Sequence, residues 1–182
     1  LGGFGITLGA HAGTGSQPII YFGTPGQKAR YLPKLCSGEW MAAYCLSEAG
    51  SGSDALGMKS KAVLTPDGKH YVLNGTKTFI TNGSFADFFV VLCQTDPSAK
   101  PPYRGQCTLL VDKGTKGLEA TEIIPKMGIR MTSTAELSFS DVRVPLTHLL
   151  GEEDKGFYQV LEFFDESRIE IAAQALGIAQ GA

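Results

Sequence analysis

The strongest constraint on the fold is an almost unbroken apolar run, Phe88-Phe89-Val90-Val91-Leu92-Cys93. A short apolar run between polar residues predicts a strand that is buried on both faces. Other short strands, separated by turns with glycine or proline, are predicted at residues 41–47, 59–65, 70–73, 76–81, 106–111, 118–124 and 135–142. The pair Asn74-Gly75 predicts a two-residue hairpin. Together these strands predict a mainly β fold, an antiparallel sandwich or barrel.

Helices are predicted before the strands. Residues 1–22 are rich in glycine and alanine, and we interpret them as the remnant of closely packed helices. Thr24-Pro25-Gly26-Gln27 predicts a helix start with a capping box and a proline at the first helical position. Pro33 predicts that this helix is short or bent, and Gly38 predicts its end.

Another helix is predicted from Asp154 onward. Its apolar stripe consists of Phe157, Val160, Leu161, Phe164, Ile171, Ala172, Ala175, Leu176 and Ala179. We interpret the opposite row, Glu162, Glu166 and Glu170, as a solvent-facing surface. Arg168 falls inside the apolar stripe, where a buried guanidinium needs a partner. That partner is either Asp165, one turn earlier, or a ligand or carboxylate from another segment, and the sequence leaves both open.

Composition excludes several classes of function. The 182 residues carry a formal net charge of −2 and no basic run, which argues against a nucleic-acid-binding surface. There is no signal peptide and no apolar run long enough to span a membrane. The 4 cysteines are scattered without a C-x-x-C pair, which indicates a reducing compartment. The 3 histidines are isolated from one another, so no metal site is predicted.

Two stretches are candidates for ligand binding. Residues 44–53 begin as a strand and continue as a loop of glycine and small hydroxyl residues, which offers backbone N–H groups and hydroxyls to something flat or anionic. Residues 79–83 end a strand with an aromatic ring and a hydroxyl, a suitable wall for a planar heterocycle. Residues 52–60 are close to a phosphate-binding P-loop, but Met58 interrupts the motif and a strand pattern follows it.

The chain resembles the middle of an acyl-CoA dehydrogenase. The motifs that carry the resemblance occur in the family's order and are residues 44–54, Asn74-Gly75-x-Lys77-x-x-Ile80-Thr81-Asn82-Gly83, Lys126-Met127-Gly128, Phe139-x-Asp141-Val142-x-Val144-Pro145, Gly156-Phe157 and Asp165-x-x-Arg168. The resemblance implies an antiparallel β-barrel middle domain at residues 41–150. The end of an N-terminal helical domain, residues 1–40, would precede it. Residues 151–182 would form the first helix of a C-terminal helical domain.

The resemblance also implies FAD as the cofactor. The residues that would bind it are Tyr44, Cys45, Leu46, Ser47, Gly52, Ser53, Phe79, Ile80 and Thr81. Ser47 would bond the pyrimidine end of the flavin, and Phe79 would stack beside the isoalloxazine, where many relatives carry Trp. Thr81 would bond near flavin N5. The acyl-CoA would be lined by Ser53, Asp165 and Arg168.

The implied reaction is the α,β-dehydrogenation of an acyl-CoA to a trans-2-enoyl-CoA, with electrons passed to an electron-transfer flavoprotein. A carboxylate would take the α-proton. The resemblance implies that the catalytic glutamate lies beyond Ala182; in one branch it precedes the helix arginine, but that position is Ser167 here. Because Glu166 and Glu170 are expected to point toward the acidic face, no catalytic residue is assigned within this chain.

The ends of the sequence predict a fragment, because it starts at Leu1-Gly2-Gly3 and stops inside a helical pattern. We expect this fragment alone to be inactive. The resemblance implies a dimer or tetramer at full length, in bacterial or archaeal cytoplasm or in the mitochondrial matrix. The alternatives are an acyl-CoA oxidase or another flavin oxidase, a non-catalytic relative that binds flavin or a partner, and, last, an all-β module for carbohydrate or peptide.

Overall fold

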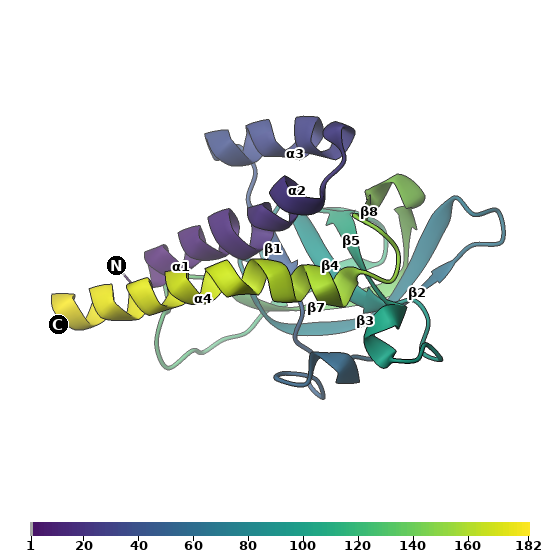
Figure 1. Ribbon diagram of the computed structural model, residues 1–182. Helices are drawn as coiled ribbons and strands as arrows, with labels where there is room; N and C mark the ends of the chain where they lie inside the picture. Colours follow the sequence, from purple (N-terminus) through teal and green to yellow (C-terminus); the bar gives the residue numbers. More distant parts are fainter. Residues whose placement is uncertain (1) are drawn as a thin grey trace.

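The computed structural model describes residues 2–182, which form one mixed sheet with helices packed along it (Figure 1). The strands are β1 (Ala42–Cys45), β2 (Lys61–Leu64), β3 (His70–Thr81), β4 (Phe88–Gln94), β5 (Gln106–Asp112), β6 (Leu118–Glu122), β7 (Thr134–Pro145) and β8 (Leu149–Leu150). They are hydrogen-bonded in the order β6-β7-β3-β2-β4-β5-β8, and β1 pairs with β4 away from this path. Three short 3₁₀ turns connect them: η2 (Ala55–Gly57), η3 (Pro102–Gly105) and η4 (Leu146–His148).

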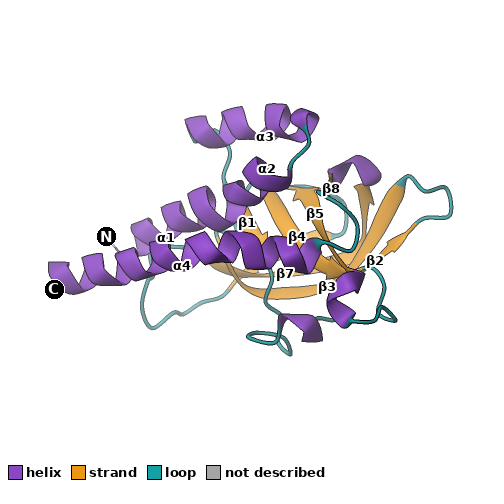
Figure 2. Ribbon diagram, in the orientation of Figure 1, coloured by secondary structure: helices purple, strands orange, loops and turns teal. Residues whose placement is uncertain are grey.

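The prediction of a mainly β antiparallel barrel is only partly right. β1 and β2 each run parallel to β4, so the sheet is mixed, and its path ends at β6 and β8 without closing into a barrel. Helices also make up a large part of the chain, as Figure 2 shows. The alternation of residues along a strand sets which side chains are buried, but it carries no information about which strand lies beside it or in which direction.

The predicted hairpin at Asn74-Gly75 is wrong. β3 passes through both residues and pairs with β7 along its length, with a register shift between Leu73 and Gly75. A Cβ at Gly75 would lie 2.3 Å from the Ser60 Oγ, so glycine is required there by close approach and not by a turn. A bulge inside a strand and a tight turn between strands use the same residue types.

The N-terminal segment is helical, as predicted, but the helix that contains Pro33 is not short, since it runs for 13 residues. The segment comprises α1 (Gly2–Ala10), the π-helical turn η1 (His11–Ser16), α2 (Gln17–Phe22) and α3 (Pro25–Ser37). The capping box is present at α3, where Gln27 N–H donates to Thr24 Oγ1 over 3.2 Å and Thr24 N–H donates to Gln27 Oε1 over 2.9 Å. The helix continues past Pro33 and ends at Gly38, whose φ is 75°.

The core forms on both faces of β4, as the apolar run predicts. On one face of β4, Phe89 and Val91 pack against side chains of the other strands. On the opposite face, Phe88 and Val90 pack against α2 and α3. A third cluster joins the first half of α4 (Gly156–Gly181) to the sheet, because Val160 and Phe163 pack with Leu92 of β4. The second half of α4 lies beside α1 (Figure 1), where Gln174 Nε2 donates to the Gly2 carbonyl over 3.2 Å.

The predicted stripe of α4 is only partly buried, and Arg168 lies outside the core. Its side chain is 68% exposed and its guanidinium is 2.9 Å from the Asp165 carboxylate. The pairing with Asp165 is therefore the reading that the structure supports. Among residues 2–182, no helix has both the length and the apolar character needed to cross a bilayer.

Candidate functional site

The two candidate stretches lie together around one cleft of about 180 Å³. The end of β1 contributes Tyr44, Leu46 and Ser47, and the end of β3 contributes Phe79, Ile80 and Thr81. α1, η1 and α4 complete the lining with Ala10, Thr14 and Phe164. Segments that are about 35 residues apart in sequence thus form, with these helices, a cleft with three aromatic rings, several aliphatic side chains and several hydroxyls, a composition typical of small-molecule sites.

Phe79 is presented outward by an irregularity in β3. The register with β7 shifts between Lys77 and Ile80, and Phe79 adopts a φ of 59°, which is unusual for a residue with a side chain. Its side chain is 69% exposed, while Thr78 and Ile80 on either side are buried. Backbone strain of this kind concentrates at ligand sites. The ring is therefore free to stack on a planar group in the cleft.

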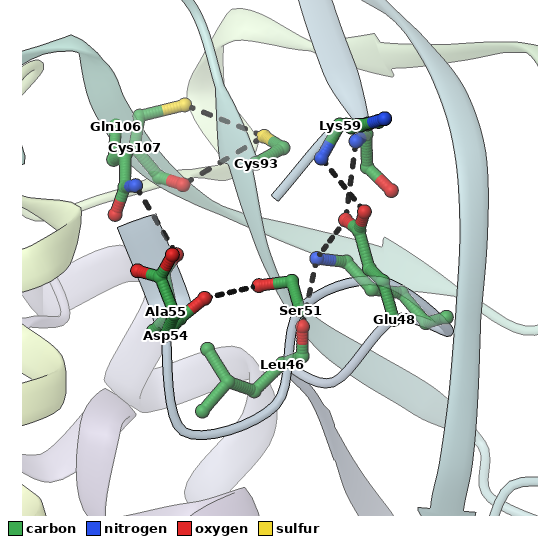
Figure 3. A network of polar contacts seen from close by, with 11 residues as sticks. Leu46, Glu48, Ser51, Asp54, Ala55, Lys59, Cys93, Gln106 and Cys107 are labelled. Atoms are coloured by element: carbon green, nitrogen blue, oxygen red, sulfur yellow. Dashed lines mark hydrogen bonds and ion pairs between the residues drawn. The ribbon is translucent and has the colours of Figure 1, made fainter. Parts of the chain in front are cut away.

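The loop after β1 is anchored by a buried ion pair that the sequence reasoning missed. Lys77 Nζ donates to Glu48 Oε1 over 2.8 Å and to the Leu46 carbonyl over 3.0 Å. Glu48 also accepts from the N–H groups of Lys59 and Ser60, at 2.7 and 3.1 Å (Figure 3). The signal in the sequence is a lysine at a strand position whose neighbours along the same face are apolar. This anchor fixes the backbone beside Ser47.

The charge state of Glu48 reflects two opposed effects. Burial raises the pKa of its carboxyl, but the hydrogen bonds from Lys77 and from the Lys59 N–H lower it more, so that the pKa ends below its usual value. The Glu48 carboxyl is therefore ionised at neutral pH. Because its remaining lone pairs are also satisfied, the pair can be accommodated in the interior.

The turn that follows Glu48 is closed by backbone and hydroxyl bonds. Glu48 and Ser51 exchange N–H···O bonds of 2.9 and 3.1 Å, and Ser51 Oγ donates to the Asp54 carbonyl over 2.6 Å (Figure 3). Gly52 and Ser53 follow in this turn and are exposed, outside the lining of the cleft. The structure therefore does not bring these two residues to the position where Ser47 and Thr81 meet.

Cys45 and Tyr44 point to opposite sides of β1. The Cys45 thiol lies in the core of the sheet, and burial raises its pKa to about 12, so only its backbone can reach a ligand. The Tyr44 ring packs edge-on against Phe163 and Phe164, with centroids 5.0 and 6.1 Å away. Its hydroxyl is buried without a hydrogen-bond partner among residues 2–182. Burial raises the pKa of Tyr44, which keeps this hydroxyl protonated as a potential donor.

Asn82 joins the two walls of the cleft to α1. Its Nδ2 donates to the Thr7 carbonyl over 3.1 Å and to the Ala42 carbonyl over 3.3 Å, and its φ is 66°. His11 makes a similar bridge, since its Nδ1 accepts from the Ala42 N–H over 3.2 Å and its Nε2 lies 3.1 Å from the Leu35 carbonyl. These residues are structural links. In the described part of the chain, no three His, Cys, Asp or Glu side chains gather as metal ligands would.

All three glutamates of the acidic row of α4 are exposed, as interpreted from the sequence, although Glu166 and Glu170 also lie against the N-terminal helices. Glu166 accepts from Tyr21 Oη over 2.6 Å and from Gln17 Nε2 over 3.3 Å. Glu170 lines a second cavity, of about 240 Å³, together with Thr14 and Thr81. The contacts of these two glutamates could not be predicted from the sequence of α4 alone, because they depend on the helices that pack beside it.

Comparison with known proteins identifies close relatives. Residues 43–142 match the family model "Acyl-CoA dehydrogenase, middle domain", and residues 1–39 match "Acyl-CoA dehydrogenase, N-terminal domain". The chain is 43% identical over 182 residues to the very long-chain specific acyl-CoA dehydrogenase, mitochondrial, of Homo sapiens. The alignment covers 98% of this chain and 28% of that relative.

Solved structures show the same fold. An acyl-CoA dehydrogenase from Bacillus anthracis complexed with FAD has a TM-score of 0.89 at 43% identity, over 96% of this chain and 29% of that one. A chain from the structure of the electron transferring flavoprotein of Acidaminococcus fermentans has a TM-score of 0.93 at 43% identity, over 98% of this chain and 46% of that one. The chain thus spans less than half the length of these relatives.

Proposed function

The chain belongs to the acyl-CoA dehydrogenase family, and on that premise we propose that its cleft holds the ring system of FAD for the α,β-dehydrogenation of an acyl-CoA thioester. The observation that carries the proposal is the meeting of Ser47, Phe79 and Thr81 around one cleft. Residues 41–150 would form the middle domain of the enzyme. Residues 1–40 and 151–182 would belong to the helical domains before and after it.

The residues of the cleft fit a flavin. The exposed Phe79 ring offers a face for stacking, and the hydroxyls of Ser47 and Thr81 can donate to ring heteroatoms. Tyr44 also lines the cleft, although its hydroxyl is buried. When bound, FAD supplies the acceptor for the β-hydride of the substrate. Leu46, Ile80 and Phe164 would exclude water from the side of the flavin ring that faces the cleft wall.

In this proposal the Thr81 hydroxyl donates a hydrogen bond near flavin N5, and Ser47 bonds the pyrimidine end of the ring. Cys45, Gly52 and Ser53 would bind FAD only through their backbone N–H and C=O groups. Ser53, Asp165 and Arg168 would contact the acyl-CoA. Asp165 and Arg168 are exposed on α4, where they form an ion pair of 2.9 Å, so both are accessible to a ligand.

We assign the proton acceptor to a segment outside residues 2–182. The support is that the lining of the cleft contains no carboxylate. This chain covers only 28% and 46% of two of the matching relatives, so they have room for such a residue elsewhere. By the same reasoning, the electron-transfer flavoprotein, the dimeric or tetrameric state, and a location in the cytoplasm or mitochondrial matrix are proposals for the intact protein.

Anaerobic titration of the intact protein tests the proposal. We expect a flavin absorption band that bleaches when an acyl-CoA is added, and a trans-2-enoyl-CoA as the product. Thr81→Val should slow the bleaching by about tenfold, because it removes one hydrogen bond to the ring. Thr121→Val, on the exposed strand β6, is the matched control. An intact protein without flavin would contradict the proposal, and rapid reoxidation by oxygen would indicate an oxidase instead.

A further inference from the structure

The second cavity continues directly from the cleft. Ala10, Thr14 and Thr81 line both spaces, so a molecule that reacts beside Thr81 extends into the second cavity. Between α1 and α4 this cavity is lined by glycines and by aliphatic side chains, but also by the polar groups of Ser167, Glu170 and Gln174. A space for a hydrocarbon chain has no need of a carboxylate, which is costly to desolvate.

Glu170 is the unusual member of this lining. Its Oε2 approaches so closely to η1 that a Cβ at Gly13 would lie 2.3 Å from it. Within residues 2–182, no hydrogen bond or ion pair reaches the Glu170 carboxylate, whereas Glu166, one turn earlier, is held by Tyr21 and Gln17. Burial, and then the neighbouring Glu166, raise the pKa of Glu170. Glu170 is exposed in the described part of the chain, so water can satisfy its carboxylate until a molecule fills the cavity.

Glu170 lies beyond the reacting position and not at it. It lines the second cavity but is absent from the lining of the cleft, where Phe79 and Thr81 meet. If an acyl-CoA reacts beside Thr81, a group at this place would contact the part of its acyl chain that is farther from the thioester than the carbons being oxidised. Its natural effect is therefore on which acyl chain is accepted.

Building on the proposed function, we propose that Glu170 makes the enzyme prefer acyl-CoA substrates whose acyl chain carries a hydrogen-bond donor, a hydroxyl or an ammonium group, over plain alkyl thioesters. The donor would satisfy the carboxylate inside the cavity. An alkyl chain of the same length would bury the carboxylate unpaired. A hydrogen bond to a charged acceptor contributes about 1.5–3 kcal/mol, which corresponds to a preference of about 10- to 100-fold in kcat/KM.

The experiment compares ω-hydroxyacyl-CoA thioesters of increasing length with alkyl thioesters that carry a methyl group in place of the hydroxyl. The ω-aminoacyl series distinguishes an ammonium donor from a hydroxyl. In the intact wild-type enzyme, one donor-bearing thioester should exceed its alkyl match by at least about tenfold in kcat/KM. Glu170→Ala should remove this preference, mainly through KM, and should improve the alkyl substrates. Glu162→Gln, a carboxylate on the same helix outside the cavity, should leave the preference unchanged.

The outcomes separate the two proposals. If alkyl thioesters bleach the flavin but no donor-bearing thioester is preferred, or if Glu170→Ala leaves the preference intact, the role of Glu170 is wrong while the proposed function stands. If no thioester bleaches a flavin in the wild-type enzyme, the proposed function itself fails. Loss of alkyl activity in Glu170→Ala with the flavin still bound would also overturn the specificity role, because it would make Glu170 necessary for the chemistry.

Discussion

Lys77 Nζ lies 2.8 Å from Glu48 Oε1, and the two side chains are 0% and 9% exposed. This pair joins the middle of β3 to the loop that forms one wall of the cleft. Replacing Lys77 by Met would leave the Glu48 carboxylate buried without its cation, so we expect a loss of about 3–5 kcal/mol in the free energy of unfolding. Chemical denaturation measures this change.

The matched control is Lys61→Met, because Lys61 is an exposed lysine on the neighbouring strand β2. Its effect should stay within about 0.5 kcal/mol. A Lys77→Met protein as stable as the Lys61→Met protein would show that the pair does not anchor the loop.

The same pair predicts an acid-sensitive contribution to stability. The pKa of Glu48 in the folded protein is lowered from its usual 4.5, so the unfolded state binds the proton more readily. The contribution is therefore complete above the usual pKa and is lost as the pH falls through the lower folded value. The difference in unfolding free energy between wild type and Glu48→Gln should shrink over this acidic range and stay constant near neutrality. A difference that grows on acidification would contradict the assignment.

Phe79 is expected to act on cofactor binding and not on stability. Its ring is 69% exposed, so Phe79→Ala should change the free energy of unfolding by less than about 0.5 kcal/mol. Loss of the stacking face should weaken FAD binding by about tenfold. Phe79→Trp should keep or improve the affinity. Fluorescence titration of the apoprotein measures both, with Phe4→Ala in α1 as the control for a partly exposed phenylalanine.

The four cysteines should divide into one reactive and three unreactive thiols. Cys36 is exposed, whereas Cys45, Cys93 and Cys107 are buried. Burial raises the pKa of Cys45 to about 12, and the hydrogen bond with Cys93, followed by burial, raises the pKa of Cys107. Since the thiolate is the nucleophile, an aromatic disulfide reagent should modify Cys36 first. Cys36→Ser should abolish the fast phase, and the other thiols should react only after denaturation. Fast modification in the Cys36→Ser protein would contradict the buried positions.

The strands were the most predictable part of the fold, because the pattern of apolar residues along a strand indicates whether one or both of its faces are buried. The run from Phe88 to Cys93 became β4, which is buried along its whole length. The capping box at Thr24 was equally predictable, since it depends on residues within one helical turn. The parallel pairing of β1 with β4 and the bulge at Gly75 were not, because they depend on segments distant in sequence.

For the site, the sequence indicated the two stretches that meet but not how they are supported. Hydroxyls, glycines and an aromatic at strand ends are local signals, and Ser47, Phe79 and Thr81 do lie around one cleft. The anchor from Lys77 to Glu48 and the amide of Asn82 depend on burial that only the fold creates. The cavity beside Glu170 also depends on the fold, because α1 and η1 line it together with α4.

The parallel pairing of β1 with β4 has a consequence for the order of assembly. Residues 42–45 can pair only after residues 88–91 have left the ribosome, and no tight turn can join two parallel strands. The helices that precede β1 in the chain contact it through the hydrogen bond between His11 and Ala42. Residues 2–45 therefore cannot complete their docking on the sheet until β4 has been synthesised.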